Sequence, residues 1–189
     1  MPATVALRTE PLPAEGPPLE FEAVYAEHFD FVWRNLRRLG VPESALRDAT
    51  QEVFVVVYRR LGEFVPRGTL RSWLYSILRR VALAQKRQYR LQRPTEMQGT
   101  DPLADESHPD PETDAIRGQS LRRLLELLNE LDDDKREALV SVDLEDMSVP
   151  EACVALEVNI NTLYSRLSAA RRQIRQRLAS DHREGGRHP

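Results

Sequence analysis

Residues 148–178 read SVPEACVALEVNINTLYSRLSAARRQIRQRL, and this stretch predicts two helices joined by a tight turn. Ser148 followed by Glu151 has the form of a capping box, in which each side chain bonds to the backbone of the other residue. Pro150 is tolerated in the first helical turn because no intrahelical donor is lost there. Small and apolar residues then recur three and four positions apart as far as Leu156, so the first helix is expected to bury one face.

The second helix of the stretch is expected to begin at Ile160, with Asn159 as its N-cap, and to run to about Leu178. Its inward residues are expected to be Ile160, Leu163, Leu167, Ala170, Ile174 and Leu178. Its outer face and flanks carry Asn161, Thr162, Tyr164, Ser165, Arg166, Ser168, Ala169, Arg172 and Arg175. Small residues let a helix approach the major groove of DNA closely, while Ser, Asn and Arg hydrogen-bond to base edges or phosphates. The pattern therefore predicts a helix-turn-helix, although an ordinary amphipathic hairpin has the same spacing.

A long amphipathic helix is predicted upstream, from about Thr69 to residue 93. Its buried stripe is expected to contain Leu70, Trp73, Leu74, Ile77, Leu78, Val81 and Ala84. The opposite side carries Ser72, Arg79, Lys86 and Arg90, with Arg71 and Tyr75 on its flank. Trp73 lies within the stripe and is expected in the core, whereas Tyr75 lies off it and is the better candidate for stacking on a base.

The remaining segments also predict helices, so the expected fold class is all-α. Residues 21–39 have helical spacing and stop at Gly40. The next helix is expected to run from about residue 43 to 61, although residues 53–58 have strand propensity, because the flanks are helical and no partner strand is evident. Residues 121–131 form a leucine stripe, and Asp132-Asp133-Asp134 supply an acidic helix start that suits the helix dipole.

Composition divides the 189 residues into two helical domains and three other stretches. Residues 1–20 contain five prolines and are expected to form a disordered leader. Residues 94–116 combine prolines with acids and are expected to be a flexible linker. Residues 180–189 are expected to be a frayed tail. The two small helical domains are therefore predicted at residues 21–93 and 117–179.

The formal net charge is only −3, but the charges are segregated. Residues 59–93 hold ten Lys or Arg and one acid, and residues 158–178 hold five arginines and no acid. Residues 94–116 hold seven acids and no Lys or Arg, and residues 130–157 hold ten acids against two basic residues. Such basic blocks are typical of polyanion binders, although a solvated Arg-rich helix face has the same composition.

Several other classes of function are excluded by what the sequence lacks. The longest apolar run, residues 53–58, is too short to span a membrane, and no signal peptide is evident. Cys153 is the only cysteine, which excludes an internal disulfide and a multi-cysteine metal site, and it lies on an expected buried face. The histidines are scattered, and no phosphate-binding loop or zinc-protease motif is present. We therefore expect a cytoplasmic protein that is not an enzyme, with no catalytic residue, metal or cofactor.

Two sets of motifs resemble one family of bacterial proteins. Residues 48–54 (DATQEVF) and 66–75 (PRGTLRSWLY) resemble region 2 of the extracytoplasmic-function RNA polymerase sigma factors. Residues 136–139 (REAL), 148–152 (SVPEA) and 161–171 (NTLYSRLSAAR) resemble region 4 of the same family. The order of the two sets, the acidic linker between them and the total length also match the family.

The resemblance implies a dissociable specificity subunit whose partners are core RNA polymerase and promoter DNA. Asp48, Gln51 and Glu52 would dock on the clamp helices of the largest polymerase subunit, and the flap would be a further contact. The −10 element would be melted and read by Phe64, Arg67, Arg71, Tyr75, Arg79, Arg80, Lys86, Arg87 and Arg90. The −35 element would be read by Asn161, Thr162, Tyr164, Ser165, Arg166, Ser168, Arg171 and Arg172. The family commonly uses an anti-sigma factor, which makes one a candidate partner, and no membrane contact is implied.

Several positions depart from the usual pattern of the family. Arg80 stands where Asn is usual, Glu157 and Asn161 stand where Gly is usual, and Ala84 stands where Asp is often found. These departures bear on the −10 base preference and on the geometry of the turn. The alternative function is a stand-alone helix-turn-helix regulator that binds duplex DNA without polymerase. It accounts for residues 117–178 but not for the Asp48 motif or the basic aromatic helix.

Overall fold

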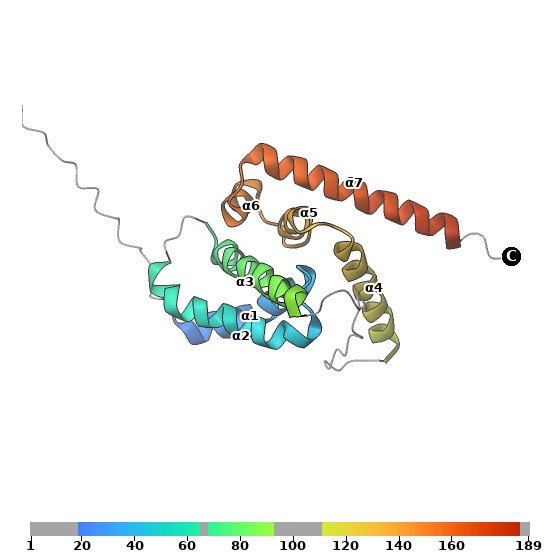
Figure 1. Ribbon diagram of the computed structural model, residues 1–189. Coiled ribbons are helices and arrows are strands. Elements are labelled where there is room, and N and C mark those ends of the chain that lie inside the picture. The colour runs from blue at the N-terminus through green and yellow to red at the C-terminus, as the bar shows by residue number, and fades with distance from the viewer. Residues whose placement is uncertain (1–18, 65–67, 93–110, 186–189) are drawn as a thin grey trace, which may run out of the picture.

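The structure is a computed structural model that describes residues 19–64, 68–92 and 111–185 (Figure 1). Its helices are α1 (Phe21–Arg38), α2 (Glu43–Arg60), α3 (Leu70–Gln92), α4 (Pro111–Asn129), α5 (Asp133–Leu139), α6 (Val149–Leu156) and α7 (Ile160–Gly185). A 3₁₀ turn, η1 (Leu61–Glu63), follows α2, and a π-helical turn, η2 (Val140–Leu144), follows α5. No strand occurs in the described ranges, so the predicted all-α class is confirmed. The expected leader, except for its last two residues, lies outside these ranges.

Helices α1, α2 and α3 pack against one another and form the N-terminal unit. Gly40 ends the turn after α1 with a positive φ of 85°, a conformation that glycine adopts without steric cost. The predicted helix at residues 43–61 is confirmed as α2, and its Val53 and Val57 are fully buried. Burial of these β-branched side chains offsets their low helix propensity.

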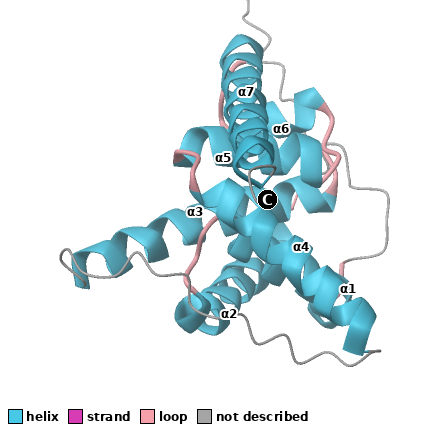
Figure 2. Cartoon of the chain, turned by 90° about the vertical axis from the view of Figure 1, so that its right-hand side faces the viewer, coloured by secondary structure: helices cyan, strands magenta, loops and turns pink. Residues whose placement is uncertain are grey.

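Helices α4 to α7 form the C-terminal unit, in which the long α7 lies across the short α5 and α6 (Figures 1 and 2). Leu163, Leu167 and Ala170 of α7 are buried, as predicted from their spacing. Ile160 and Leu178 are exposed instead, and this part of the prediction is wrong. Helix α7 is 26 residues long whereas α5 and α6 have seven and eight, so these two helices cannot cover α7 along its whole length.

The C-terminal unit packs on the N-terminal unit, chiefly through α6 on α3, with a smaller contact between α4 and α1. Helix α3 is therefore covered from two directions (Figure 1). The sequence pattern predicted a single buried stripe on this helix, but Ser72, Tyr75 and Lys86 are buried as well. Ala84 was expected in the stripe and is exposed. The second covering surface explains why the predicted outer side of α3 is largely not solvent-exposed.

Two element boundaries differ from those expected. Helix α4 begins at Pro111, inside the stretch expected to be linker, and proline suits the first turn of a helix because its missing N–H would have no partner there. Helix α7 continues to Gly185, inside the stretch expected to be a frayed tail. Residues 93–110, most of the expected linker, lie outside the described ranges.

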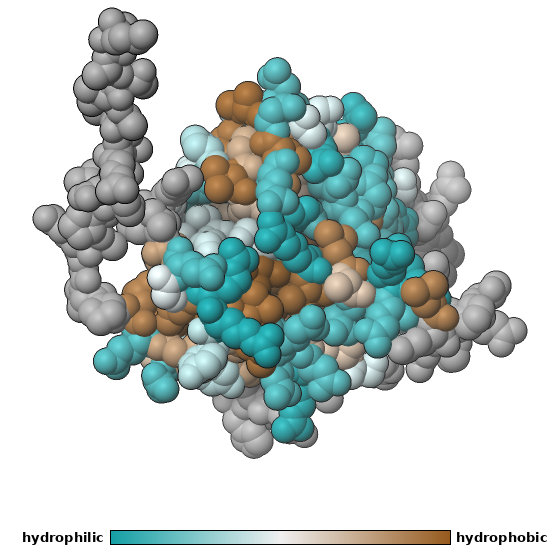
Figure 3. Space-filling model, turned by 60° about the vertical axis from the view of Figure 1, so that its left-hand side comes forward, coloured by the Kyte–Doolittle hydropathy of each residue, from teal (hydrophilic) through white to brown (hydrophobic). Residues whose placement is uncertain are grey.

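The surface of the molecule mixes hydrophobic and hydrophilic patches, as the face in Figure 3 shows. Large exposed apolar residues include Tyr25, Val55, Tyr58, Val154 and Tyr164. Across the described ranges, no helix is long and apolar enough to cross a membrane. The same ranges contain no group of His, Cys, Asp and Glu residues placed to hold a metal ion.

Candidate nucleic-acid interface

The turn between α6 and α7 is held by caps that were predicted from the sequence. Ser148 is the N-cap of α6: its Oγ accepts from the backbone N–H of Glu151 at 3.4 Å, and its own N–H donates to the Glu151 carboxylate at 3.1 Å. The Ser148 hydroxyl also donates to the Glu151 carboxylate at 2.6 Å, and this bond, together with the bond from the Ser148 N–H, lowers the pKa of Glu151. Asn159 caps α7, because its Oδ1 accepts from the N–H of Thr162 at 2.9 Å. The caps fix the angle at which α7 leaves the turn.

Between the caps, Glu157 ends α6 in the left-handed conformation, with φ at 58°. This conformation is uncommon for a residue with a side chain, and Gly is the residue that favours it. The N–H of Glu157 still bonds to the carbonyl of Val154 at 3.3 Å, and that of Val158 bonds to Cys153 at 3.0 Å. The tight turn is therefore formed even though Glu occupies the glycine position. Cys153 itself is half-buried and packs against the core.

The outer face of α7 presents most of the residues predicted to contact the −35 element. Asn161, Tyr164, Ser165, Ser168, Arg171 and Arg172 are exposed, while Thr162 and Arg166 are half-buried. Two of the arginines are already paired with acids of the same unit. Arg166 bonds to Asp134 at 2.6 Å, and Arg171 Nε bonds to Asp143 at 2.9 Å. Arg172 and the small polar residues are thus the part of this face that remains open to a ligand.

The residues predicted to contact core polymerase, Asp48, Gln51 and Glu52, are all exposed on α2. Their spacing of three and four residues places them on one face of the helix. Glu52 also accepts a hydrogen bond from Gln85 of α3 at 2.8 Å. An exposed acidic and amide face of this kind suits a basic or polar partner surface.

The residues predicted to contact the −10 element are distributed quite differently. Tyr75 is fully buried, and its hydroxyl donates to the backbone carbonyl of Glu137 at 3.3 Å, so the prediction that it lies off the buried surface is wrong. Burial raises its pKa well above the ordinary value. Phe64 is half-buried and packs its ring edge-on against Trp73, with the ring centroids 5.3 Å apart. Arg67 lies outside the described ranges.

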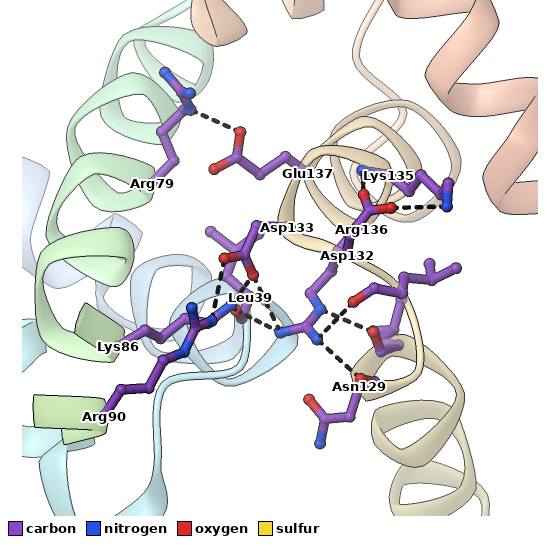
Figure 4. Close-up of polar contacts among 12 residues, drawn as sticks. Leu39, Arg79, Lys86, Arg90, Asn129, Asp132, Asp133, Lys135, Arg136 and Glu137 are labelled. Atoms are coloured by element: carbon purple, nitrogen blue, oxygen red, sulfur yellow. Dashed lines mark hydrogen bonds and ion pairs between the residues drawn. The ribbon is translucent and has the colours of Figure 1, made fainter. Parts of the chain in front are cut away.

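Five of the six basic residues of α3 pair with acids of the C-terminal unit, and Figure 4 shows the pairs of Arg79, Lys86 and Arg90. Arg79 bonds to Glu137 at 3.0 Å, and Arg90 bonds to Asp133 at 3.3 Å. The other pairs are Arg71 with Glu145, Arg80 with Glu157, and Lys86 with Asp133. Arg87 is exposed. The prediction that Lys86 faces outward is therefore wrong, since its ammonium is buried and also donates to the carbonyl of Leu39 at 3.1 Å.

Comparison with known proteins places both units in one family. Residues 24–92 match the profile of "Sigma-70 region 2", and residues 121–174 match that of "Sigma-70, region 4". The chain belongs to the extracytoplasmic-function sigma factors of the sigma-70 family. Region 2 is the N-terminal unit and region 4 lies in the C-terminal unit. A stand-alone helix-turn-helix regulator would not explain the region 2 match, so the sigma factor interpretation is the one supported.

Named relatives agree with this assignment along most of the chain. This sigma factor is 28% identical to the RNA polymerase sigma factor CnrH of Cupriavidus metallidurans, over 89% of this chain and 91% of the relative. It is 30% identical to the sigma factor SigE of Mycolicibacterium smegmatis, over 84% of this chain and 62% of the relative. The solved structure of CnrH in complex with the cytosolic domain of CnrY is similar, with a TM-score of 0.63, 26% identity, and coverage of 85% of this chain and 88% of that one.

A second solved structure supports the fold alone. It contains the sigma factor RpoE in complex with the anti-sigma factor NepR from Bartonella quintana, with a TM-score of 0.65 and 21% identity. That match covers 85% of this chain and 98% of the other chain.

Regions 2 and 4 are joined by three residues that were not predicted from the sequence. Arg34 and Arg38 of α1 both bond to Glu145, which follows η2. Arg34 and Arg38 lie four residues apart on α1, so an arginine pair on one helix face was readable from the sequence. Their acidic partner was not, because Glu145 lies more than 100 residues away and is positioned by a π-helical turn with no sequence signal.

Proposed function

We propose that this sigma factor binds core RNA polymerase, directs initiation at promoters, and divides this work between its two units. Region 4 reads the −35 element by placing α7 in the major groove, and region 2 reads and melts the −10 element. The observation that carries the proposal is the outer face of α7. Ser165, Ser168 and Arg172 are exposed on a helix whose opposite face is buried. Asn159 caps the start of this helix, and Ser148 caps the start of α6 before it. Small polar side chains with one arginine are suited to base edges and phosphates.

Region 2 is proposed to hold the displaced DNA strand along α3. Arg71, Arg79, Arg80, Lys86 and Arg90 lie on this helix, and Arg87 adds an exposed charge. Single-strand binding uses a positive groove together with aromatic side chains. Phe64 beside Trp73 is the aromatic candidate, since it is half-buried at the start of the loop before α3. Tyr75 is not included, because its ring is buried.

Core polymerase is proposed to bind the exposed face of α2 that carries Asp48, Gln51 and Glu52. An anti-sigma factor is a further proposed partner, because two similar solved structures contain sigma factors bound to other proteins, CnrY and the anti-sigma factor NepR. We further propose that the protein works in the cytoplasm as a non-catalytic initiation factor.

Run-off transcription with purified core enzyme on genomic fragments tests this function. Wild-type protein should yield specific transcripts, and the absence of any specific transcript on all fragments would reject the proposal. Ser165→Glu and Arg172→Glu should each reduce transcription about tenfold or more, since one lost base contact is equivalent to about 1–3 kcal/mol and a carboxylate adds repulsion. Both variants should still bind core enzyme.

Matched controls separate the two surfaces. Ser180→Glu changes an exposed serine on the same helix, outside the proposed DNA face, and should transcribe like wild type. Asp48→Arg should lose core binding, measured by co-elution with the polymerase. Asp30→Arg, which changes an exposed residue of α1, should not. If Ser165→Glu lost core binding as fully as Asp48→Arg, the assignment of α7 to DNA would be wrong.

A further inference from the structure

We propose that Arg34, Arg38 and Arg71 form a site on region 2 for a phosphate of single-stranded promoter DNA, and that Glu145 of region 4 occupies this site in the free protein. The inference rests on the proposed function, because it concerns the DNA surface of region 2. It adds a phosphate site that includes two arginines of α1, and it adds an internal competitor for that site. The three arginines are called the arginine socket below.

The arginine socket surrounds a carboxylate on both of its oxygens. Oε1 of Glu145 accepts from Arg34 Nε at 3.4 Å and from Arg38, while Oε2 accepts from Arg71 Nη2 at 2.7 Å. The side chain of Glu145 is only 1% exposed. A phosphodiester also presents two charged oxygens to its ligands, and the planar arginine fork suits either anion. The chemistry of the socket is therefore that of a phosphate site.

Region 2 supplies every cation of the arginine socket. Arg34 and Arg38 lie on α1 and Arg71 on α3, two helices that pack directly against each other. The guanidinium of Arg71 lies over the ring of the buried Phe31, 4.8 Å from its centroid, which supports its position. The side chains of Arg34 and Arg71 remain 44% and 50% exposed beside Glu145, so a ligand arriving from solvent reaches them.

The arginine socket also holds an unused donor. The Nε of Arg38 is buried and has no hydrogen-bond partner among the described residues. A buried donor without a partner costs free energy. Glu145 therefore leaves the hydrogen-bonding capacity of the site incomplete. A phosphate, which has more acceptor positions than a carboxylate, offers this donor an additional partner.

The arginine socket lies at one end of a row of cations that continues along α3. From Arg71 to Arg90 the helix advances about 28 Å, at about 1.5 Å per residue. Five cations of this row form ion pairs with acids of region 4. The pairs are Arg71 with Glu145, Arg79 with Glu137, Arg80 with Glu157, and both Lys86 and Arg90 with Asp133. A series of anions along a basic helix is also what a DNA backbone presents. The row favours a nucleic-acid strand over a single small anion as the competing ligand.

Two of the pairs use residues that depart from the usual family pattern. Arg80 replaces the usual Asn and Glu157 replaces the usual Gly, and these two side chains bond to each other. The carboxylate of Glu157 also lies 3.8 Å from Arg79. The closed contact between regions 2 and 4 therefore includes an ion pair made by two residues that depart from the family pattern. DNA binding by region 2 and closure by region 4 then exclude each other.

Fluorescence anisotropy of the full-length protein with a labelled, mixed-sequence single-stranded DNA tests the competition. Glu145→Gln should bind this DNA about tenfold more tightly than wild type, a typical size for coupling between two states. Glu126→Gln is the matched control, because this exposed acid pairs with Arg123 within region 4, and it should bind like wild type. Circular dichroism must show the same helix content in all variants. If Glu145→Gln does not fold, Glu145→Asp, which keeps the charge on a shorter side chain, should give a smaller increase of the same sign.

A second substitution separates a phosphate site from a mere contact between units. Adding Arg34→Ala to Glu145→Gln should weaken DNA binding several-fold and should lower the slope of log affinity against log salt by about 0.7, the value for one phosphate on a single strand. Unchanged affinity in Glu145→Gln would overturn the competition. Equal or tighter binding after the added Arg34→Ala would overturn the phosphate site, as would preference for a polyaspartate peptide over DNA. Failure of the proposed function is distinguishable, because it would abolish run-off transcription by the wild type.

Discussion

Arg136→Ala should be the most damaging single substitution near the contact between regions 2 and 4. The side chain is buried, and its guanidinium donates to four carbonyl groups. Nε donates to Leu128 at 2.8 Å and Nη1 donates to Leu39 at 3.0 Å. Nη2 donates to Asn129 at 3.2 Å and to Leu131 at 3.1 Å. One side chain thus joins the end of α4, the turn before α5 and the end of α1 (Figure 4).

The expected loss of stability follows from these bonds. A hydrogen bond to a charged group contributes about 1.5–3 kcal/mol, and a buried acceptor left without a partner costs about 1–3 kcal/mol. The Leu39 carbonyl keeps a second donor in Lys86, and the Leu128 carbonyl keeps one in the N–H of Leu131, so two carbonyls, those of Asn129 and Leu131, lose their donor on truncation. Water entering the vacated space recovers part of this loss. We therefore expect Arg136→Ala to lower the free energy of unfolding by about 3–5 kcal/mol, a large part of the stability of a typical domain.

Urea unfolding followed by far-UV circular dichroism measures this difference. Arg136→Lys should fall between wild type and the alanine variant, because an ammonium has no planar fork with which to reach all four carbonyls. Arg122→Ala is the control, since Arg122 is an exposed arginine on α4, and it should change stability by less than about 0.5 kcal/mol. A loss below about 1 kcal/mol for Arg136→Ala would refute the reasoning from these four bonds.

Three further predictions concern other local features. Gly40→Ala should cost at least about 1–2 kcal/mol in urea unfolding, because φ is positive there and the new Cβ would collide with the guanidinium of Arg136; an unchanged midpoint would refute this. Ser148→Ala should cost about 1 kcal/mol by removing the capping box, and Ser148→Asp should restore most of it. Burial raises the pKa of Glu137 above its ordinary value of 4.5, although Arg79 opposes this shift. The folded state therefore binds more protons than the unfolded state, and the free energy of unfolding falls as the pH rises through the folded pKa. Glu137→Gln should flatten that part of the curve of stability against pH, and an unaltered slope would contradict the assignment.

Local features of the fold were predictable because their causes lie within a few residues. The capping box at Ser148, the N-cap at Asn159 and the stop at Gly40 each depend on backbone groups three or four positions away. The same holds for the buried stripe of α7 and for the exposed face that includes Ser165 and Arg172. Helical periodicity reports one buried face reliably when a helix packs on one side only.

The second buried face of α3 was not predictable from the pattern, because it depends on contacts with residues far along the chain. Tyr75 and Lys86 lie off the predicted apolar stripe, yet both are buried, with hydrogen-bond partners supplied by the opposite unit or by Leu39 at the end of α1. A polar side chain whose partner lies about 50 residues or more away looks the same in sequence as a solvated one. For Arg136 this reason applies to one partner only, since the carbonyl of Leu39 lies 97 residues away whereas those of Leu128, Asn129 and Leu131 lie five to eight residues away.

The net charge of −3 takes on a physical meaning once the pairs are assigned. The basic block at residues 59–93 and the acidic block at residues 130–157 are separate in sequence, but cations of α3 from the first block face acids of the second across the contact between regions 2 and 4. Not all of these pairs hold the contact equally. Glu157 is 60% exposed, so water and salt weaken its attraction to Arg80, whereas the carboxylates of Glu145 and Glu137 are almost fully buried. Closure therefore depends mainly on the bonds that the two buried carboxylates make to arginines of region 2, and hydration of the freed carboxylates offsets part of the loss when region 4 leaves. The same two acids cover the cations of region 2 that a DNA strand needs, so the groups that make opening costly are also the groups that keep the free protein from binding DNA.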